Sequence, residues 1–199
     1  QIMSRFEVLT LGNSSALSAF GRHPSGQLIN IHEHILLIDC GEGTQDRLAQ
    51  YSAKTHKIEH IFISHLHGDH YFGLPGLLTS MNLTGRKHAL HIYSPPGLEK
   101  ILDHINTVAN SVMQFKIHWH TLESKEPLTI VDDSMKKISA FPLSHRIPTY
   151  GFIIKEKPGK RVFLVEKPGA DFFNFEVIKK LKEGENVELP DGNTIYFLD

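Results

Sequence analysis

The sequence has almost no cysteine, almost no net charge and no long apolar run. Cys40 is the single cysteine, so no internal disulfide can form and a metal site has to use histidine, aspartate or glutamate. Lysine and arginine total 21 against 22 acidic residues, and this balance gives no global attraction to polyanions or membranes. Apolar runs such as residues 35–38 are far shorter than the roughly 18 residues that span a bilayer. We therefore expect a soluble, cytoplasmic protein with no membrane partner.

Short apolar or β-branched segments alternate with helical patterns along most of the chain, which predicts a layered α/β domain. The expected strands are residues 5–11, 27–31, 35–39, 60–63, 89–93, 116–121, 128–131, 136–141 and 151–154. The expected helices are residues 44–52, 71–83 and 97–110. In the last helix, apolar residues recur at helical spacing, so one face packs against the core.

The composition changes after Ile154. Residues 155–182 contain eight basic and four acidic residues, whereas residues 183–199 contain five acidic residues and no basic one. A Pro-Asp-Gly sequence between Val187 and Ile195 predicts a hairpin. These changes indicate a core domain at residues 3–154 and a projecting arm at residues 155–199. The alternative is that the arm's charged segment is an ordinary solvated helix.

One short segment carries the chemistry. His65, His67, Asp69 and His70 lie within six residues, directly after an apolar strand and before a helix. Ligands on a loop at the carboxyl end of a strand are typical of sites in open α/β sheets. The spacing suits one metal at His65 and His67 and a second metal at Asp69 and His70. Two adjacent divalent ions can activate water and neutralise a phosphodiester.

Longer stretches around this motif resemble the ribonuclease Z family of the metallo-β-lactamase superfamily. These stretches are residues 37–45, 61–70, 72–78, 92–98 and 141–152, with later similarity at 181–185 and 189–192. The resemblance implies a metallo-β-lactamase-like αβ/βα sandwich, of which this chain contains either the whole or only the N-terminal half plus the arm. It also implies a zinc-dependent endoribonuclease that removes the 3′ trailer from precursor tRNA by attack of a metal-bound hydroxide, and it indicates a homodimer.

The resemblance also assigns individual residues. It makes His65, His67 and His145 ligands of one Zn²⁺, and Asp69 and His70 ligands of the other, with Mn²⁺ and Co²⁺ as alternative ions. Asp69 is the expected catalytic residue, because a carboxylate beside the metals can take the proton of the attacking water. The substrate-binding residues expected for the tRNA are Arg22, Lys155, Lys157, Lys160 and Arg161.

Other histidines and acidic residues are expected to be structural. Asp39, at a strand end, is expected to support the ligands or cap a turn. His118 and His120 face one way on a strand, but no third ligand is close to them in sequence, so we expect no metal there. Cys40 is expected to be a small buried side chain.

The chain departs from the family pattern, and this leaves alternatives open. The bridging aspartate and the last histidine ligand that the family uses do not follow His145, so five of seven expected ligands are present. One alternative is another metallo-β-lactamase-fold hydrolase, such as a phosphodiesterase for small molecules. The other is an inactive truncated fragment that binds tRNA or dimerises.

Overall fold

The structure is a computed structural model that describes residues 5–17, 20–158, 173–188, 192 and 194–195. The chain divides into two compact units, residues 1–156 and residues 157–199. No helix in the described ranges is both long and apolar enough to cross a bilayer.

The first unit is built on a six-stranded sheet with the order β1-β2-β3-β4-β5-β6. Its strands are β1 (Phe6–Gly12), β2 (Gly26–Ile31), β3 (His34–Ile38), β4 (Ile58–Phe62), β5 (Leu90–Ser94) and β6 (Ile117–Thr121). The first three strands pair antiparallel, and β3 to β6 pair parallel. The carboxyl ends of β3, β4, β5 and β6 therefore meet at one edge of the sheet.

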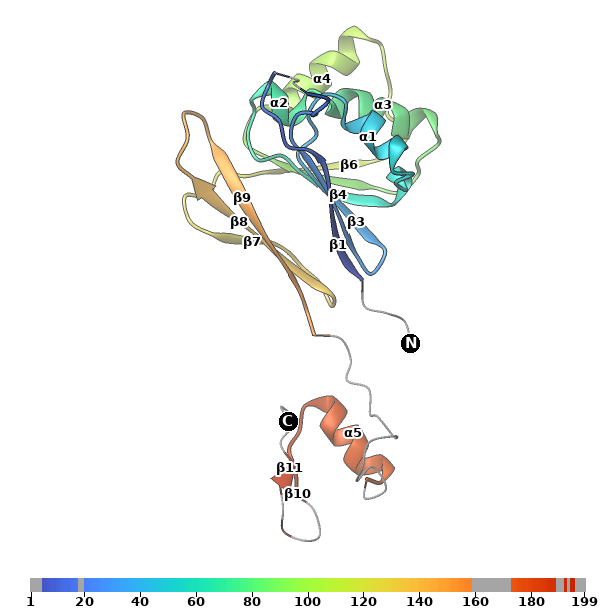
Figure 1. Ribbon diagram of the computed structural model, residues 1–199, viewed down its shortest axis with the longest axis vertical. Helices are drawn as coiled ribbons and strands as arrows, with labels where there is room; N and C mark the ends of the chain where they lie inside the picture. Colours follow the sequence, from blue (N-terminus) through green and yellow to red (C-terminus); the bar gives the residue numbers. More distant parts are fainter. Residues whose placement is uncertain (1–4, 18–19, 159–172, 189–191, 193, 196–199) are drawn as a thin grey trace. The chain divides into compact units, whose positions relative to one another are not determined.

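Three helices cover one face of this sheet: α1 (Thr44–Gln50), α3 (Leu74–Leu83) and α4 (Leu98–Val108) (Figure 1). A single 3-10 turn, Thr55–Lys57, leads into β4. The helices bury a core of aliphatic side chains between themselves and the strands, including Leu37, Leu48, Ile61, Leu77, Ile92 and Leu102. Burial of this apolar area is the main force that holds the layer together.

The opposite face of the sheet packs against a second, three-stranded antiparallel sheet (Figure 1). Its strands are β7 (Leu128–Asp132), β8 (Lys136–Leu143) and β9 (Thr149–Glu156). A second apolar cluster joins the two sheets, with Leu36 and Phe62 from the large sheet and Ile138, Ala140 and Tyr150 from the small one. Strands β3 and β4 are thus covered on both faces, as buried parallel strands require.

The second unit contains α5 (Phe175–Glu183) and a hairpin of β10 (Val187–Glu188) with β11 (Thr194–Ile195). The side chain of Asn174 accepts a hydrogen bond from the backbone N–H of Val177 at 2.9 Å and so caps the helix start. The antiparallel pairing of β10 with β11 confirms the predicted hairpin. Most of its turn lies outside the described residues.

The predicted helix at residues 71–83 is confirmed over its last ten residues, which form α3, but its predicted start is wrong. The chain instead forms α2 (Gly68–Tyr71), breaks, and begins α3 at Leu74 with Pro75 in its first turn. In a continuous helix Pro75 would lack the N–H that bonds to the carbonyl of Tyr71, and its ring would collide with that carbonyl. At the break, the Gly73 N–H donates to the carbonyl of Cys40 at 2.9 Å. The α2 turn, rather than a loop, therefore carries Asp69 and His70.

His60 on β4 makes the stability of the fold depend on pH. Burial, together with the charges of His91 and Lys136, lowers the pKa of His60 to about 4. Its buried Nδ1 has no hydrogen-bond partner among the described residues. In the unfolded chain this imidazole takes up a proton below about pH 6.5, whereas in the fold it does so only near pH 4. Acid therefore favours unfolding between these two values.

We expect the free energy of unfolding to fall by about 2 kcal/mol from about pH 7 to about pH 5 through His60 alone. Urea denaturation at the two pH values measures this change. The variant His60→Gln cannot titrate and should lose that part of the pH dependence, while His104→Gln, at an exposed position on α4, should keep it. An unchanged pH dependence in His60→Gln would contradict this assignment.

Candidate metal centre

The carboxyl end of β4 leads directly into the motif that the sequence singles out. His65 and His67 follow the strand, and Asp69 and His70 lie in the single turn of α2. Parallel strands place their carboxyl ends together, so the neighbouring chain segments converge on this point. The Cys40 N–H, just beyond β3, donates to the carbonyl of His70 at 2.8 Å and ties the turn to the sheet.

The small sheet contributes the third histidine of the cluster. His145 lies in the connection between β8 and β9, and the backbone N–H of Tyr150 at the start of β9 donates to the carbonyl of Ser64 at 2.9 Å. One ligand atom from each of His65, His67 and His145 lies within 4.8 Å of the others. His145 Nε2 is 3.3 Å from His67 Nδ1. The structure thus brings together three residues that are separated by up to 80 positions in sequence.

Asp69 and His70 lie next to this group. The distance from His70 Nε2 to Asp69 Oδ2 is 3.7 Å, and the rings of His65 and His70 are 3.9 Å apart between centroids. The five residues that the resemblance selects as ligands are therefore neighbours in space. Imidazole nitrogens and a carboxylate are the donor set that zinc and similar divalent ions accept.

Asp39 supports the ligands from behind. One of its carboxylate oxygens, Oδ2, lies 2.6 Å from His70 Nδ1 and accepts hydrogen bonds from the hydroxyls of Ser25 and Ser64 at 3.0 Å. The other oxygen accepts from the Ser64 N–H at 2.8 Å. The pairing at Nδ1 leaves His70 Nε2 facing Asp69 and the cluster. Asp39 therefore orients the ring of His70, a candidate ligand.

The environment sets the protonation of the histidines. Burial, together with the positive charge that His70 and His67 can carry, lowers the pKa of His65 to about 4. His65 is therefore neutral at physiological pH, which is the form that binds metal. Burial lowers the pKa of His70 as well, but the hydrogen bond to Asp39 and its negative charge outweigh burial, so the pKa is raised.

An exposed aromatic ring lies over the turn that carries Asp69 and His70. Phe72 is 63% exposed, and a Cβ at Gly68 would meet its ring at 2.1 Å. The phenyl ring therefore lies against the backbone of Gly68, between two of the candidate ligands, with much of its surface open. The sequence analysis missed Phe72, as well as Ser25 and Ser64. Phe72 and Ser64 could have been selected because they lie beside the histidine motif in sequence, whereas no sequence signal indicates Ser25.

The predicted substrate-binding residues come from separate parts of the chain. Arg22 is exposed in the connection between β1 and β2. Lys155 is exposed near the end of β9, six residues beyond Thr149 and hence about 20 Å along the strand from it. Lys157 is half-buried at the start of the second unit. Lys160 and Arg161 lie outside the described residues.

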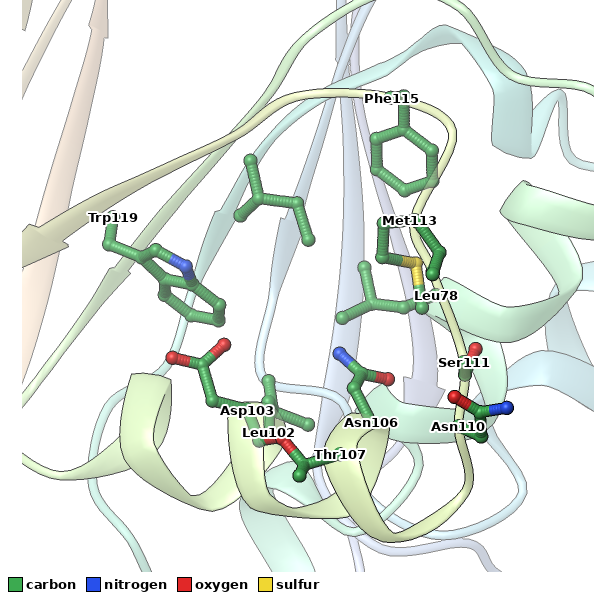
Figure 2. Close-up of a pocket in the computed structure, with 12 residues that line it drawn as sticks. Leu78, Leu102, Asp103, Asn106, Thr107, Asn110, Ser111, Met113, Phe115 and Trp119 are labelled. Atoms are coloured by element: carbon green, nitrogen blue, oxygen red, sulfur yellow. The ribbon is translucent and has the colours of Figure 1, made fainter.

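A large hollow of about 630 Å³ lies elsewhere, between α4, the segment after it and β6 (Figure 2). Its floor is apolar, with Met113, Phe115 and Trp119, and Asp103 stands at its rim. None of the five candidate ligands lines it. This hollow is therefore not part of the candidate metal centre.

Comparison with known proteins identifies relatives of this chain. A family model described as Anti-Pycsar protein Apyc1 matches residues 6–185. The chain is 38% identical to a ribonuclease Z of Bacteroides thetaiotaomicron over 195 residues, covering 97% of this chain and 61% of the relative. It is 44% identical to a ribonuclease Z of Cytophaga hutchinsonii over 188 residues, covering 94% of this chain and 60% of the relative. The chain thus spans about 60% of the length of these curated relatives.

Solved structures show the same fold. The human short-form tRNase Z matches with a TM-score of 0.70 and 33% identity, covering 75% of this chain and 64% of that chain. The metallo-β-lactamase fold protein YhfI of Bacillus subtilis matches with a TM-score of 0.59 and 20% identity, covering 75% and 56%. The two-sheet core of this chain accordingly has the metallo-β-lactamase fold, as the sequence predicts.

The hydrogen bond between Asp39 and His70 leads to a test of the centre. Asp39→Asn removes the negative charge but keeps the shape, and asparagine tolerates the positive φ of 55° at this position. We expect this change to weaken zinc binding by about 10- to 100-fold, because such supporting carboxylates orient ligands and raise their basicity. Competition with a chromogenic chelator measures the affinity.

Ser25→Ala provides the matched control, since Ser25 donates to the same carboxylate oxygen without touching a histidine ring. We expect a smaller loss from it than from Asp39→Asn. Equal zinc affinity in Asp39→Asn and the unaltered chain would show that Asp39 does not support the centre.

Proposed function

Because the chain belongs to the family described as Anti-Pycsar protein Apyc1 and has the metallo-β-lactamase fold, we propose that it is the metal-binding part of a ribonuclease Z-type endoribonuclease. The substrate is precursor tRNA, and the product is a tRNA freed of its 3′ trailer. We further propose that the metal is zinc and that the protein is a cytoplasmic homodimer.

The observation that carries the proposal is the cluster at the carboxyl end of β4. Ligand atoms of His65, His67 and His145 converge within 4.8 Å, and Asp69 and His70 stand beside them. A chain with this donor set is 35–44% identical to proteins named ribonuclease Z. The donors fit a divalent ion, because His65 is neutral and both imidazole and carboxylate are zinc ligands.

The residues of this chain have distinct parts in the reaction. His65, His67 and His145 would hold one ion, and Asp69 and His70 would hold the other. When bound, such ions supply Lewis-acid chemistry toward the phosphate and lower the pKa of water. In the hydrolysis, the water oxygen forms a bond to phosphorus while the bond from phosphorus to the 3′ oxygen breaks. The departing 3′ oxygen takes up a proton from solvent, so the tRNA carries a 3′-hydroxyl and the trailer keeps the phosphate.

Asp69 is the residue proposed to take the proton of the attacking water. Its side chain is largely buried but not enclosed, and its Oδ2 faces His70 Nε2 at 3.7 Å. A carboxylate held at this place can accept a proton from a water molecule at the cluster and pass it to solvent. Asp39, which holds the other face of the His70 ring, keeps that geometry in place.

The second unit is proposed to bind the body of the tRNA away from the chemistry, together with Arg22, Lys155, Lys157, Lys160 and Arg161. Lys179, Lys180 and Lys182 are exposed on α5 within the basic segment. Lysine contacts to phosphates give affinity without reading the base sequence. The exposed ring of Phe72 beside the ligands offers a surface on which a base next to the cleaved bond can stack.

A second candidate function is hydrolysis of a small phosphodiester at the same centre. The observation in its favour is that the matching family model carries a description other than ribonuclease Z. The same ligands and the same proton acceptor would serve this reaction. The two functions differ in whether the basic second unit contributes to substrate binding.

We expect His67→Ala to lower the amount of bound zinc and to abolish cleavage of precursor tRNA, because it removes a proposed ligand just after the carboxyl end of β4. The measurements are metal content by mass spectrometry and cleavage on a denaturing gel, made on the full-length protein. Circular dichroism should show an unchanged fold, since His67 is only half-buried. His104→Ala, on the exposed face of α4, is the control. Full activity in His67→Ala would exclude this centre.

We expect replacing Lys179, Lys180 and Lys182 together by alanine to raise the KM for precursor tRNA about tenfold, roughly 1.4 kcal/mol of lost binding. Hydrolysis of a chromogenic phosphodiester should stay unchanged. The matched control is Glu176→Gln with Glu183→Gln on the same helix, which should not raise KM. Equal loss on both substrates would indicate a structural role for α5, and no loss on either would favour the small-substrate function.

A further inference from the structure

A row of histidines crosses the large sheet on the face opposite its helices. His60 on β4 lies opposite His91 on β5, and His91 lies opposite His118 on β6. Their rings are 5.1 Å and 4.7 Å apart between centroids. His120, two residues further along β6, lies on the same face, with its ring 5.2 Å from that of His91. We refer to His60, His91, His118 and His120 as the histidine row.

The alternation of β6 separates this row from the hollow on the helix side. Trp119 points into the hollow between α4 and β6 (Figure 2). Its two neighbours therefore point to the other face, because successive side chains of a strand alternate. His91, His118 and His120 are each half-buried, so an ion from solvent can reach them.

The closest contact in the row joins two ring nitrogens. His91 Nδ1 lies 2.9 Å from His120 Nε2, and the two rings are inclined by only 19°. The metal centre described above contains the same kind of contact, because His67 Nδ1 lies 3.3 Å from His145 Nε2. In a metal-free protein, one proton shared between such nitrogens holds them together. A divalent ion can take the place of that proton.

We propose that His91 and His120, with His118 stacked beside them, form a second metal site that takes a divalent transition ion such as Cu²⁺ or Ni²⁺. Metal–imidazole bonds of about 2.0–2.1 Å place two nitrogens about 2.9 Å apart at a right angle and about 3.4 Å apart at a tetrahedral angle. The observed separation therefore matches the right angle of square-planar or octahedral ions. Among the described residues, three donor atoms converge within 4.8 Å only at His65, His67 and His145, so water completes the second site.

The chemistry of the donors agrees with this choice. Burial lowers the pKa of His91, and the charges of His118 and His120 lower it further. Burial and His118 also lower the pKa of His120. Both rings are thus neutral at physiological pH and have a nitrogen lone pair for a metal. A pair of imidazole donors favours Cu²⁺ and Ni²⁺ over Mg²⁺, Ca²⁺ or Mn²⁺.

The site is distinct from the proposed catalytic centre. Its ligands come from the middle of β5 and from β6, whereas the catalytic ligands follow the end of β4 or lie between β8 and β9. The proposal therefore does not depend on the proposed ribonuclease activity.

The test uses the full chain with the first centre disabled by the changes His67→Ala, His70→Ala and His145→Ala. Calorimetric titration with CuCl₂ should show one tight ion per chain, and electron paramagnetic resonance of the Cu²⁺ should show splitting from nitrogen ligands. Adding His91→Gln and His120→Gln should abolish both signals. His120→Gln as the only addition should weaken Cu²⁺ binding by at least tenfold. This variant tests the site with one change fewer.

The matched control adds His88→Gln and His104→Gln instead, which removes two exposed histidines that do not belong to the row. This control should keep the bound Cu²⁺. Circular dichroism verifies that each variant is folded. Absence of a tight ion when the first centre is disabled would overturn the proposal, as would an ion that persists after both His91 and His120 are replaced.

Discussion

The carboxylate of Asp39 is the contact on which the candidate metal centre depends. It stands at the end of β3 and binds the backbone and hydroxyl of Ser64, just before the histidine motif, and the ring of His70 within it. Two strand ends and the α2 turn are thus fixed to one charged group that is itself buried. A buried carboxylate is stable only when hydrogen bonds satisfy it. The groups that Asp39 orients are therefore the same groups that stabilise its buried charge.

Much of the architecture could be predicted from local patterns. The nine strands of the first unit lie within a few residues of the predicted ones, because buried strands leave short β-branched runs in the sequence. The start of the helix predicted at residues 71–83 could not be placed from periodicity, because its apolar spacing continues through Gly73 and Pro75. Pro75 excludes a helical hydrogen bond to Tyr71, and the approach of Gly73 to the backbone of Cys40 and Gly41 shows where the chain breaks.

The candidate site shows the same division between local and distant information. His65, His67, Asp69 and His70 are visible as a motif because they lie within one short segment. His145 could be selected only through the family resemblance, since its spacing carries no signal. His118 and His120 have no third candidate ligand near them in sequence, because the histidine beside them in space, His91, belongs to another strand. Residues that meet through the pairing of parallel strands are distant in sequence, and no local pattern reports them.

The hairpin that carries His145 has a consequence for folding. Residues 67 and 145 are 78 positions apart, and an ion held by both closes that length of chain into a loop. A covalent cross-link over such a loop raises the free energy of the unfolded chain by about 4.5 kcal/mol, because it removes conformational entropy. A metal that binds only when the two sheets are packed together would act in a similar way, as a reversible cross-link between them. The ion would then be part of the folding equilibrium of this domain as well as part of its chemistry.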